Sequence, residues 1–164
     1  IEVPSTCSKL DFDGVDDHVS MSVSSTYMTL AFWIKIDDTS DTAGIADGSG
    51  YGNLDLYNNT SGKYYIYTTN TDGARTILIS STSVVQSDWY YLVVVLGSGQ
   101  RKIYQNNVLV ASDTKTARPD TIFGIGQRDV YKLEGSISSF NMYNRALTTA
   151  EISQNYNAQK NRFI

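Results

Sequence analysis

Hydrophobic side chains recur at every second position along most of this chain, and that period restricts the fold more than any other feature of the sequence. In the segment 29–36, Leu30 and Ile34 fall on one face, whereas Trp33 falls on the other. A period of two is the pattern of a β-strand that turns one face to a core. Because the pattern recurs almost to the end of the chain, the sequence predicts an all-β protein.

Short segments of strand character alternate with residues that favour turns. The expected strands are 9–12, 18–23, 29–36, 54–57, 63–68, 76–80, 89–96, 102–105, 108–112, 121–125 and 136–143. Between them stand turn sequences such as Asp13-Gly14 and the Asp-Gly-Ser-Gly run at 47–50. Strands that recur about every 8–12 residues, with turns of this composition, are typical of β-sandwiches and β-barrels.

One predicted strand departs from the alternation. Every residue of the segment 89–96 (WYYLVVVL) is apolar or aromatic, so we expect both of its faces to be covered. A second sheet would cover one face of this strand. A loop, the terminal helix or another subunit would cover the other face.

Near the end of the chain the period changes to that of a helix. Thr148 is followed three residues later by Glu151, which is the spacing of a capping box. Ile152 and Tyr156 are four residues apart and therefore share one side of a helix that we expect to end near Gln159. The sequence thus predicts one short C-terminal helix that packs its Ile152/Tyr156 edge on the sandwich.

Size and composition exclude several classes of protein. The chain has 164 residues, which fits a single domain over residues 1–164. One His and one Cys exclude a disulfide within the chain and metal sites that need several such residues. A net charge of −4 without a Lys/Arg run argues against nucleic acid as a partner. Apolar runs fall short of the roughly 18 residues that span a bilayer, so we expect no membrane insertion.

Four stretches of the chain resemble one known family, in the same order. They are 10–19 (LDFDGVDDHV), 32–35 (FWIK), 89–94 (WYYLVV) with the hairpin at 102–110, and 135–137 (GSI) with 142–152. Together they are similar to the laminin-G-like domains of the concanavalin A-like lectin/glucanase superfamily. The resemblance implies a jelly-roll β-sandwich of two curved antiparallel sheets, in agreement with the strand pattern. It leaves the activity open, because one fold serves many functions.

Carboxylate pairs that could catalyse glycoside hydrolysis are scarce in the sequence. Retaining glucanases of this architecture carry two glutamates on one strand, with carboxyl groups about 5–5.5 Å apart. The glutamates of this chain, Glu2, Glu134 and Glu151, cannot be neighbours on a strand. Asp55 stands in an expected strand without a second carboxylate that alternates with it. We therefore predict no catalytic residues, and a small glycan hydrolase or lyase ranks third among the functional hypotheses.

Acidic residues crowd the first predicted turn. Asp11, Asp13, Asp16 and Asp17 lie within seven residues around Gly14. Calcium prefers several carboxylate oxygens completed by carbonyl groups and water. The alternative is a turn in which Asp13 and Asp17 accept backbone N–H bonds. We expect at most one structural calcium, held by Asp13 and Asp17, and no organic cofactor.

The family resemblance adds an expectation about this metal. Related domains often hold a structural calcium between the first turn and the last strand, where an Asp directly follows the Ile of the Gly-x-Ile segment. In this chain the corresponding position is Ser138, after Ile137. This departure leaves the calcium hypothesis dependent on Asp13 or Asp17.

Tyrosine and asparagine gather between residues 47 and 71, a composition typical of sugar-binding sites. Aromatic rings stack on the C–H faces of sugars, and amide or carboxylate groups bond the hydroxyls. Alternation places Tyr65 and Tyr67 on one face, with Tyr57 near them on the adjacent strand. The candidate ligand-binding residues are Tyr51, Asn53, Tyr57, Tyr65 and Tyr67. The alternative is that this aromatic row seals a sheet or meets a neighbouring subunit.

These observations favour a non-catalytic recognition module that binds a glycan or another surface ligand. We expect it to be displayed outside a cell or on the surface of a virion, such as a phage particle. The alternative is a structural subunit of a virion or appendage, whose aromatic faces contact sister subunits of a homo-oligomer. Substitution of Tyr65 and Tyr67 separates the two hypotheses, because it would remove glycan binding in the first case and assembly in the second.

Overall fold

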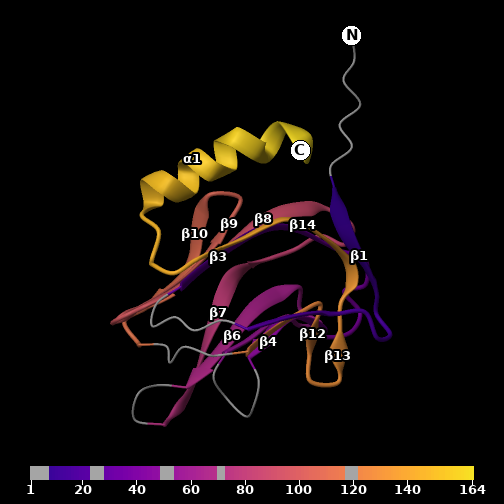
Figure 1. Ribbon diagram of the computed structural model, residues 1–164, viewed down its shortest axis with the longest axis horizontal. Helices are drawn as coiled ribbons and strands as arrows, with labels where there is room; N and C mark the ends of the chain where they lie inside the picture. Colours follow the sequence, from indigo (N-terminus) through magenta and orange to yellow (C-terminus); the bar gives the residue numbers. More distant parts are fainter. Residues whose placement is uncertain (1–7, 23–27, 49–53, 70–72, 117–121) are drawn as a thin grey trace.

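Two antiparallel sheets packed face to face form the protein (Figure 1). The computed structural model describes residues 8–22, 28–48, 54–69, 73–116 and 122–164. Within these residues each large sheet has six strands. The prediction of an all-β sandwich of two antiparallel sheets with one short C-terminal helix is confirmed. None of the helices in the described ranges is long and apolar enough to cross a membrane.

Each sheet combines a run of consecutive strands, within residues 89–113 in one and 43–83 in the other, with strands that are distant in sequence. Sheet 1 consists, in spatial order, of β1 (Lys9–Asp13), β14 (Glu134–Tyr143), β3 (Met28–Ile36), β8 (Trp89–Gly97), β9 (Gln100–Gln105) and β10 (Val108–Asp113). Sheet 2 consists of β2 (Val19–Ser22), β11 (Ile122–Ile125), β4 (Ala43–Gly48), β5 (Leu54–Asn58), β6 (Lys63–Thr69) and β7 (Arg75–Ser83). A small hairpin joins β12 (Gln127–Arg128) to β13 (Tyr131–Lys132), and α1 (Thr149–Gln159) lies near the end of the chain.

The main core fills the space between the two sheets. Leu30 and Ile34 of β3 point into it and are fully buried, as the alternation in this strand predicts. Ile66 of β6 faces them from sheet 2 and is equally buried. Since the two-residue period decides which side chains enter this core, it also decides which side chains point away from it.

The outer face of sheet 1 is covered by α1, which lies across it on the side away from sheet 2 (Figure 1). Ile152 of the helix is fully buried in a second apolar cluster with Trp33 and Val93 of the sheet. The Trp33 ring lies 4.3 Å from the ring of Phe163, and its indole N–H donates to the Gln159 side chain at 3.1 Å. The terminal helix is therefore the cover that the wholly apolar strand β8 requires.

The start of α1 has the predicted cap. Thr148 accepts a hydrogen bond from the backbone N–H of Glu151, whose carboxylate accepts one in return from the Thr148 N–H at 2.8 Å. Arg145 adds two further hydrogen bonds to the same carboxylate. Arg145, together with the Thr148 donors, lowers the pKa of Glu151 to about 2. The expected capping box is thus present and holds the helix where it meets the sheet.

A buried arginine links the two sheets at the side where β7 and β10 approach each other. The Arg101 side chain is fully buried and donates to Asp113 of its own sheet. It also donates to the Thr68 hydroxyl at 2.7 Å and to the Thr76 carbonyl at 3.2 Å, both in sheet 2. Because the charge is paired with Asp113 and two further N–H groups bond to sheet 2, the burial of Arg101 is sustainable and the side chain fixes this edge of the sandwich.

The sequence-based prediction is wrong at strand β4, and no sequence pattern indicates the β12–β13 hairpin. Asp47 and Gly48 were expected in a turn but belong to β4, a central strand of sheet 2. The strand is rich in Ala and Gly, which have low β propensity. Its pairing with β5 and β11 on either side overrides that local preference.

We expect Trp33→Ala to lower the free energy of unfolding by about 3–5 kcal/mol, because it leaves a large cavity under α1. Chemical denaturation followed by circular dichroism measures this change. Leu109→Ala, at a residue that is 48% exposed on the same sheet, serves as the control and should change stability by about 0.5 kcal/mol or less. Equal effects of the two substitutions would contradict the packing of α1 on Trp33.

Candidate functional site

The face of sheet 2 that points away from the core carries two rows of register-paired residues. One row, across β4 to β7, is Asp47, Asp55, Tyr67 and Ile77. The second row is Gly44, Tyr57, Tyr65 and Ile79. We call these two rows, with Arg75 and Arg128 beside them, the tyrosine face. α1 lies on the opposite side of the sandwich and does not cover it (Figure 1).

Three tyrosine rings stack on one another in the middle of the tyrosine face. The centroid of the Tyr57 ring lies 5.1 Å from that of Tyr65 and 5.8 Å from that of Tyr67, with interplanar angles of 22° and 11°. Tyr57 is buried, whereas Tyr65 and Tyr67 remain partly accessible. Burial, followed by the neighbouring Tyr67 hydroxyl, raises the pKa of Tyr57. Tyr57 therefore supports the stack, and the rings of Tyr65 and Tyr67 keep some accessible surface.

The β12–β13 hairpin closes one side of the stack. Gly44 makes room for the hairpin, because a Cβ atom there would lie 2.3 Å from both the backbone nitrogen of Arg128 and the carbonyl oxygen of Tyr131. The hairpin places the guanidinium of Arg128 4.5 Å from the centroid of the Tyr57 ring, a cation–π contact. The same guanidinium lies 5.9 Å from the centroid of the Tyr67 ring, so Arg128 contacts two rings of the stack.

Arg75, at the start of β7, lies over the other side of the stack. Its guanidinium is 4.7 Å from the centroid of the Tyr67 ring and donates a hydrogen bond to Asp55. The side chain of Arg75 is nevertheless 43% exposed. A guanidinium held by an aromatic ring and a carboxylate, with its remaining N–H groups toward solvent, is ordered before any ligand arrives.

A single carboxylate serves both arginines. Asp55 is largely buried and pairs with Arg75 through the hydrogen bond given above. Its Oδ2 also lies 3.4 Å from Nε of Arg128, an ion pair that lacks hydrogen-bond geometry. Two guanidiniums and one carboxylate therefore meet beside the tyrosine rings.

Asp47 lies directly opposite Asp55 on the neighbouring strand. Its Oδ2 accepts a hydrogen bond from the backbone N–H of Asp129 in the hairpin at 3.1 Å. Burial raises the pKa of Asp47, and the negative charge of Asp55 adds to the shift, although the Asp129 N–H opposes it. The second carboxylate of this pair is therefore less ready to ionise than an exposed aspartate.

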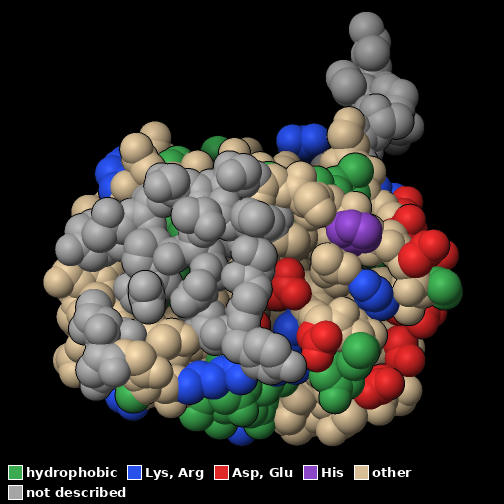
Figure 2. Space-filling view, turned by 60° about the horizontal axis from the view of Figure 1, so that its bottom comes forward, with side chains coloured by type: hydrophobic (Ala, Val, Ile, Leu, Met, Phe, Trp, Pro, Cys, Tyr) green, Lys and Arg blue, Asp and Glu red, His purple; other side chains and the backbone are tan. Residues whose placement is uncertain are grey.

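Apolar side chains complete the tyrosine face at the edge of sheet 2. Ile77 is 37% exposed and Ile79 is 41% exposed, and both belong to the edge strand β7. Figure 2 shows one side of the molecule, on which apolar side chains lie directly against basic ones at one edge. Acidic side chains gather elsewhere in the same view, on the side of the histidine. The charge of this acidic protein is thus unevenly distributed.

The structure brings together three of the five predicted ligand-binding residues. Tyr57, Tyr65 and Tyr67 form the stack, with Tyr65 and Tyr67 on one face as the alternation predicts. Tyr51 and Asn53 lie outside the described residues. Whether any of these residues binds a ligand remains a prediction.

Four charged or aromatic residues of this region are not predicted by the sequence patterns. Arg75 was just outside the expected strand 76–80, and Asp47 was assigned to a turn. Arg128 and Tyr131 belong to a hairpin that the sequence did not indicate, and their side chains interact at 5.6 Å. Arg75 lies seven residues beyond the expected strand 63–68, and Asp55 lies before it. Their opposite charges flank this tyrosine-rich strand in the sequence, a pattern from which their pairing could have been predicted.

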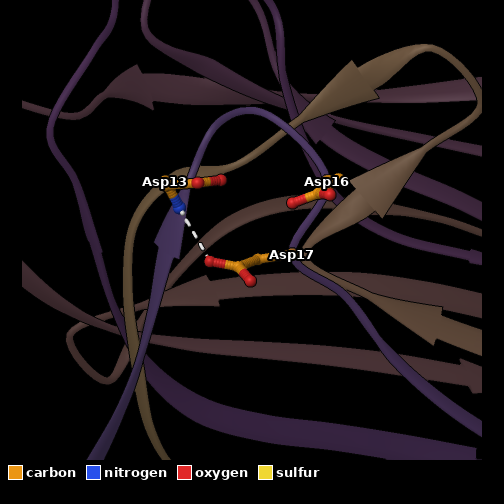
Figure 3. Close-up of side chains that lie close together, drawn as sticks. All are labelled: Asp13, Asp16 and Asp17. Atoms are coloured by element: carbon orange, nitrogen blue, oxygen red, sulfur yellow. Dashed lines mark hydrogen bonds between the residues drawn. The ribbon is translucent and has the colours of Figure 1, made fainter.

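The acidic turn brings three carboxylates close together. Oxygens of Asp13, Asp16 and Asp17 all lie within 4.8 Å of one another, and Figure 3 shows the side chains turned toward each other across the loop. Asp13 accepts a hydrogen bond from the Val15 N–H at 2.8 Å, and Asp17 accepts one from the Asp13 N–H at 3.3 Å. These are the backbone hydrogen bonds that the alternative hypothesis, a turn stabilised by Asp13 and Asp17, predicts. They leave other carboxylate oxygens that could bind calcium.

The last strand places a different residue at this turn from the one the resemblance implied. Glu134 is the register partner of Asp13, and its Cβ lies 3.2 Å from the position a Cβ would take on Gly14. Ser138 pairs with Lys9 at the other end of β1 and donates to the Ser8 carbonyl. The carboxylate of β14 nearest the acidic turn is thus Glu134, four positions before Ser138.

A cleft of 160 Å³ opens beside the acidic turn, between Gly14 and the hairpin residues Val130 and Lys132. Asp38 and Asp41 line it together with Glu134. Both aspartates accept backbone N–H bonds within their own loop, from Ser40 at 2.7 Å and from Thr42 at 2.6 Å. Their carboxylates therefore shape the loop that forms the wall of the cleft.

Comparison with known protein families gives one match. The family model described as the concanavalin A-like lectin/glucanases superfamily matches residues 13–153, which is most of the chain. No curated protein sequence matches the chain at a significant level.

Solved structures share the fold at low sequence identity. The receptor-binding domain of botulinum neurotoxin C/D mosaic serotype is 18% identical, with a TM-score of 0.75 over 92% of this chain and 42% of that one. The ligand-binding domain of botulinum neurotoxin serotype D, crystallised with N-acetylneuraminic acid, is 18% identical with a TM-score of 0.71 over the same shares. The heptameric SAP-like pentraxin of Limulus polyphemus is 16% identical, with a TM-score of 0.70 over 92% of this chain and 82% of that one. The chain thus spans about two fifths of the neurotoxin domains, and the likeness shows the fold.

We expect Asp47→Asn to stabilise the protein at neutral pH. Because the folded state raises the pKa of Asp47 above 3.8, ionisation of this group costs stability as the pH rises through that range. The melting temperature of the variant should exceed that of the wild type at pH 7, and the two should converge below about pH 3. Asp88→Asn removes the same charge from an exposed loop position and should not show the convergence. A variant that melts lower than the wild type at pH 7 would contradict this account of Asp47.

Calcium at the acidic turn is expected to raise the melting temperature. At a free calcium concentration ten times the dissociation constant of the site, binding would add about 1.4 kcal/mol to the free energy of unfolding. Thermal unfolding in millimolar calcium and in excess EDTA measures the effect, with magnesium as the competing ion. Asp13→Asn and Asp17→Asn should abolish it. Equal melting temperatures of the wild type in calcium and in EDTA would refute the site.

Proposed function

Because the chain belongs to the concanavalin A-like lectin/glucanases superfamily, we propose that it is a non-catalytic module that binds a glycan through the tyrosine face. The observation that carries the proposal is the pair of partly accessible rings, Tyr65 and Tyr67, held in a stack beside polar groups on a sheet face that α1 does not cover. Rings offer apolar surface to sugar C–H groups, and Arg75 and Asp55 offer donors and acceptors to hydroxyls.

The stack is ordered in a way that favours binding. Tyr65 and Tyr67 rest against the buried Tyr57 ring, and Tyr57 in turn rests against Arg128. Side chains that are already held in place lose little conformational entropy when a ligand settles on them. Ile77 and Ile79 extend the apolar surface along the edge strand, so more than one sugar unit could lie across the face.

Proteins of the same fold support a binding role. One neurotoxin domain that shares the fold was crystallised with N-acetylneuraminic acid, a sugar. The proposal for this chain does not take its contacts from that complex, because the sequences are 18% identical. We further propose that the module is displayed extracellularly or on a virion surface, where a glycan-binding face would meet its ligand.

The assignment as non-catalytic rests on how the two carboxylates of the face are used. Asp55 neutralises Arg75 and Arg128, and Asp47 anchors the hairpin through the Asp129 N–H. Both groups thus have structural partners that account for their positions. Release of a reducing sugar from a glycan by the wild type, and its loss in Asp47→Asn, would contradict this part of the proposal and favour a glycan hydrolase.

A second candidate function is supported by the exposed isoleucines. Ile77 and Ile79 belong to edge strand β7, where they are the register partners of Tyr67 and Tyr65. An apolar strip on a sheet edge also suits contact with a sister subunit in a virion or appendage. One structural relative, the Limulus pentraxin, is heptameric. In this alternative the tyrosine face would be a subunit interface.

We expect Tyr65→Ala and Tyr67→Ala each to weaken glycan binding about tenfold, because each removes one stacking surface. A glycan array followed by titration calorimetry with the best-bound glycan measures the change. Tyr65→Phe keeps the ring and should retain most of the binding. Leu109→Ala, on the opposite sheet, should bind like the wild type.

Light scattering after size-exclusion chromatography distinguishes the two candidate functions. An unchanged oligomeric state together with lost glycan binding supports recognition. Loss of an oligomer in both tyrosine variants, with no glycan bound by the wild type at any concentration, would overturn the recognition proposal and favour the structural subunit.

A further inference from the structure

We infer that the glycan bound by the tyrosine face carries an anionic group, a carboxylate or a sulfate, and that Arg75 binds it. This inference rests on the proposed function and names the class of sugar that the same face would select. Arg75 is the charged residue of the face with the greatest accessible side-chain surface, at 43%, against 12% for Asp55 and 19% for Arg128. A ligand on the rings would therefore meet this cation first.

The ion pairs of the face leave N–H donors of Arg75 for an anion. Arg75 and Arg128 share the single carboxylate of Asp55, and only the bond from Arg75 has hydrogen-bond geometry. Asp47 supplies a second negative charge, but it accepts the Asp129 N–H of the hairpin and makes no ion pair with either guanidinium among the described residues. A guanidinium with donors left over, such as that of Arg75, binds an oxyanion more strongly than a neutral hydroxyl.

The placement of Arg75 suits a planar or multi-oxygen anion. Of its five N–H donors, one is given to Asp55, and the guanidinium lies over the Tyr67 ring at 4.7 Å. The ring and the carboxylate hold the guanidinium in one orientation, so its remaining donors form a fixed fork. Such a fork binds two oxygens of one carboxylate or sulfate at once. The same sugar unit would then rest its C–H face on the neighbouring ring of Tyr65, because Arg75 lies over that of Tyr67.

The charges on the rest of the molecule restrict where an anionic glycan can bind. The protein carries a net charge of −4, and its acidic residues Asp13, Asp16 and Asp17 cluster at a turn between β1 and β2. An anionic glycan would be repelled by that region and attracted at the tyrosine face. Binding there should consequently weaken as salt screens the Arg75 charge.

The experiment compares oligogalacturonate with its methyl ester, which has the same sugar chain without the charge. A sulfated and an unsulfated galactan provide the sulfate arm, and calorimetry at low and at physiological salt gives the affinities. The wild type is expected to bind one anionic glycan about tenfold tighter than its neutral counterpart. Arg75→Gln should erase that difference and keep the binding of the neutral glycan. Arg75→Lys keeps the charge without the fork and should retain only part of the preference.

Arg145→Gln is the matched control. Arg145 is also an exposed arginine paired to a carboxylate, that of Glu151, but it lies at the helix side of the sandwich. The variant should keep the full preference for the anionic glycan. Circular dichroism and thermal melting establish that each variant is folded.

The outcomes separate this inference from the proposed function. Equal affinity of the wild type for anionic and neutral glycans, both lost in Tyr65→Ala, would overturn the role of Arg75 and leave glycan recognition standing. An anionic preference that survives in Arg75→Gln would also overturn it. Absence of binding to every glycan tested would overturn both the inference and the proposed function.

Discussion

The burial of Trp33 under the C-terminal helix is the interaction on which the arrangement of the molecule depends. Sheet 1 contains a strand, β8, that is apolar on both faces, and such a strand is stable only when both faces are removed from water. The space between the sheets buries one face. The stacking of Trp33 on Phe163 and Tyr156, with Ile152 beside them, buries the other. Both faces of sheet 1 are thus packed against other elements. The outer face of sheet 2 is not covered by α1.

The tyrosine face results from elements that are distant in sequence. β5 and β6 supply the rings, β7 supplies Arg75, and the β12–β13 hairpin supplies Arg128. Asp55 connects them, because it pairs with both guanidiniums and stands next to Tyr67 in the register. Each cation is held against a ring and a carboxylate, so the polar groups of the face are fixed before binding. Such preorganisation favours selective recognition of a ligand with matching charge and shape.

Much of this architecture could be predicted from local patterns. The alternation placed Leu30 and Ile34 in the core and Trp33 outside it, and the capping box placed the start of α1 at Thr148. The alternation also put Tyr65 and Tyr67 on one face of their strand. Strand β4 could not be found in this way, because Ala, Gly and Asp give no periodic signal and the strand is held by its neighbours. With β4 missed, the position of Asp47 opposite Asp55 was missed as well.

The sequence by itself determined the faces of the strands and the start of the helix, because a period of two residues and the spacing of a cap are local properties. It therefore determined that Tyr65 and Tyr67 point the same way. Only the tertiary structure decided that these two side chains lie on the outer face of sheet 2, away from α1. It also decided that Arg75 and Arg128 meet at Asp55. Those contacts join residues up to 73 positions apart, between Asp55 and Arg128. Such pairs depend on strand order and on the space above Gly44, neither of which a local pattern records.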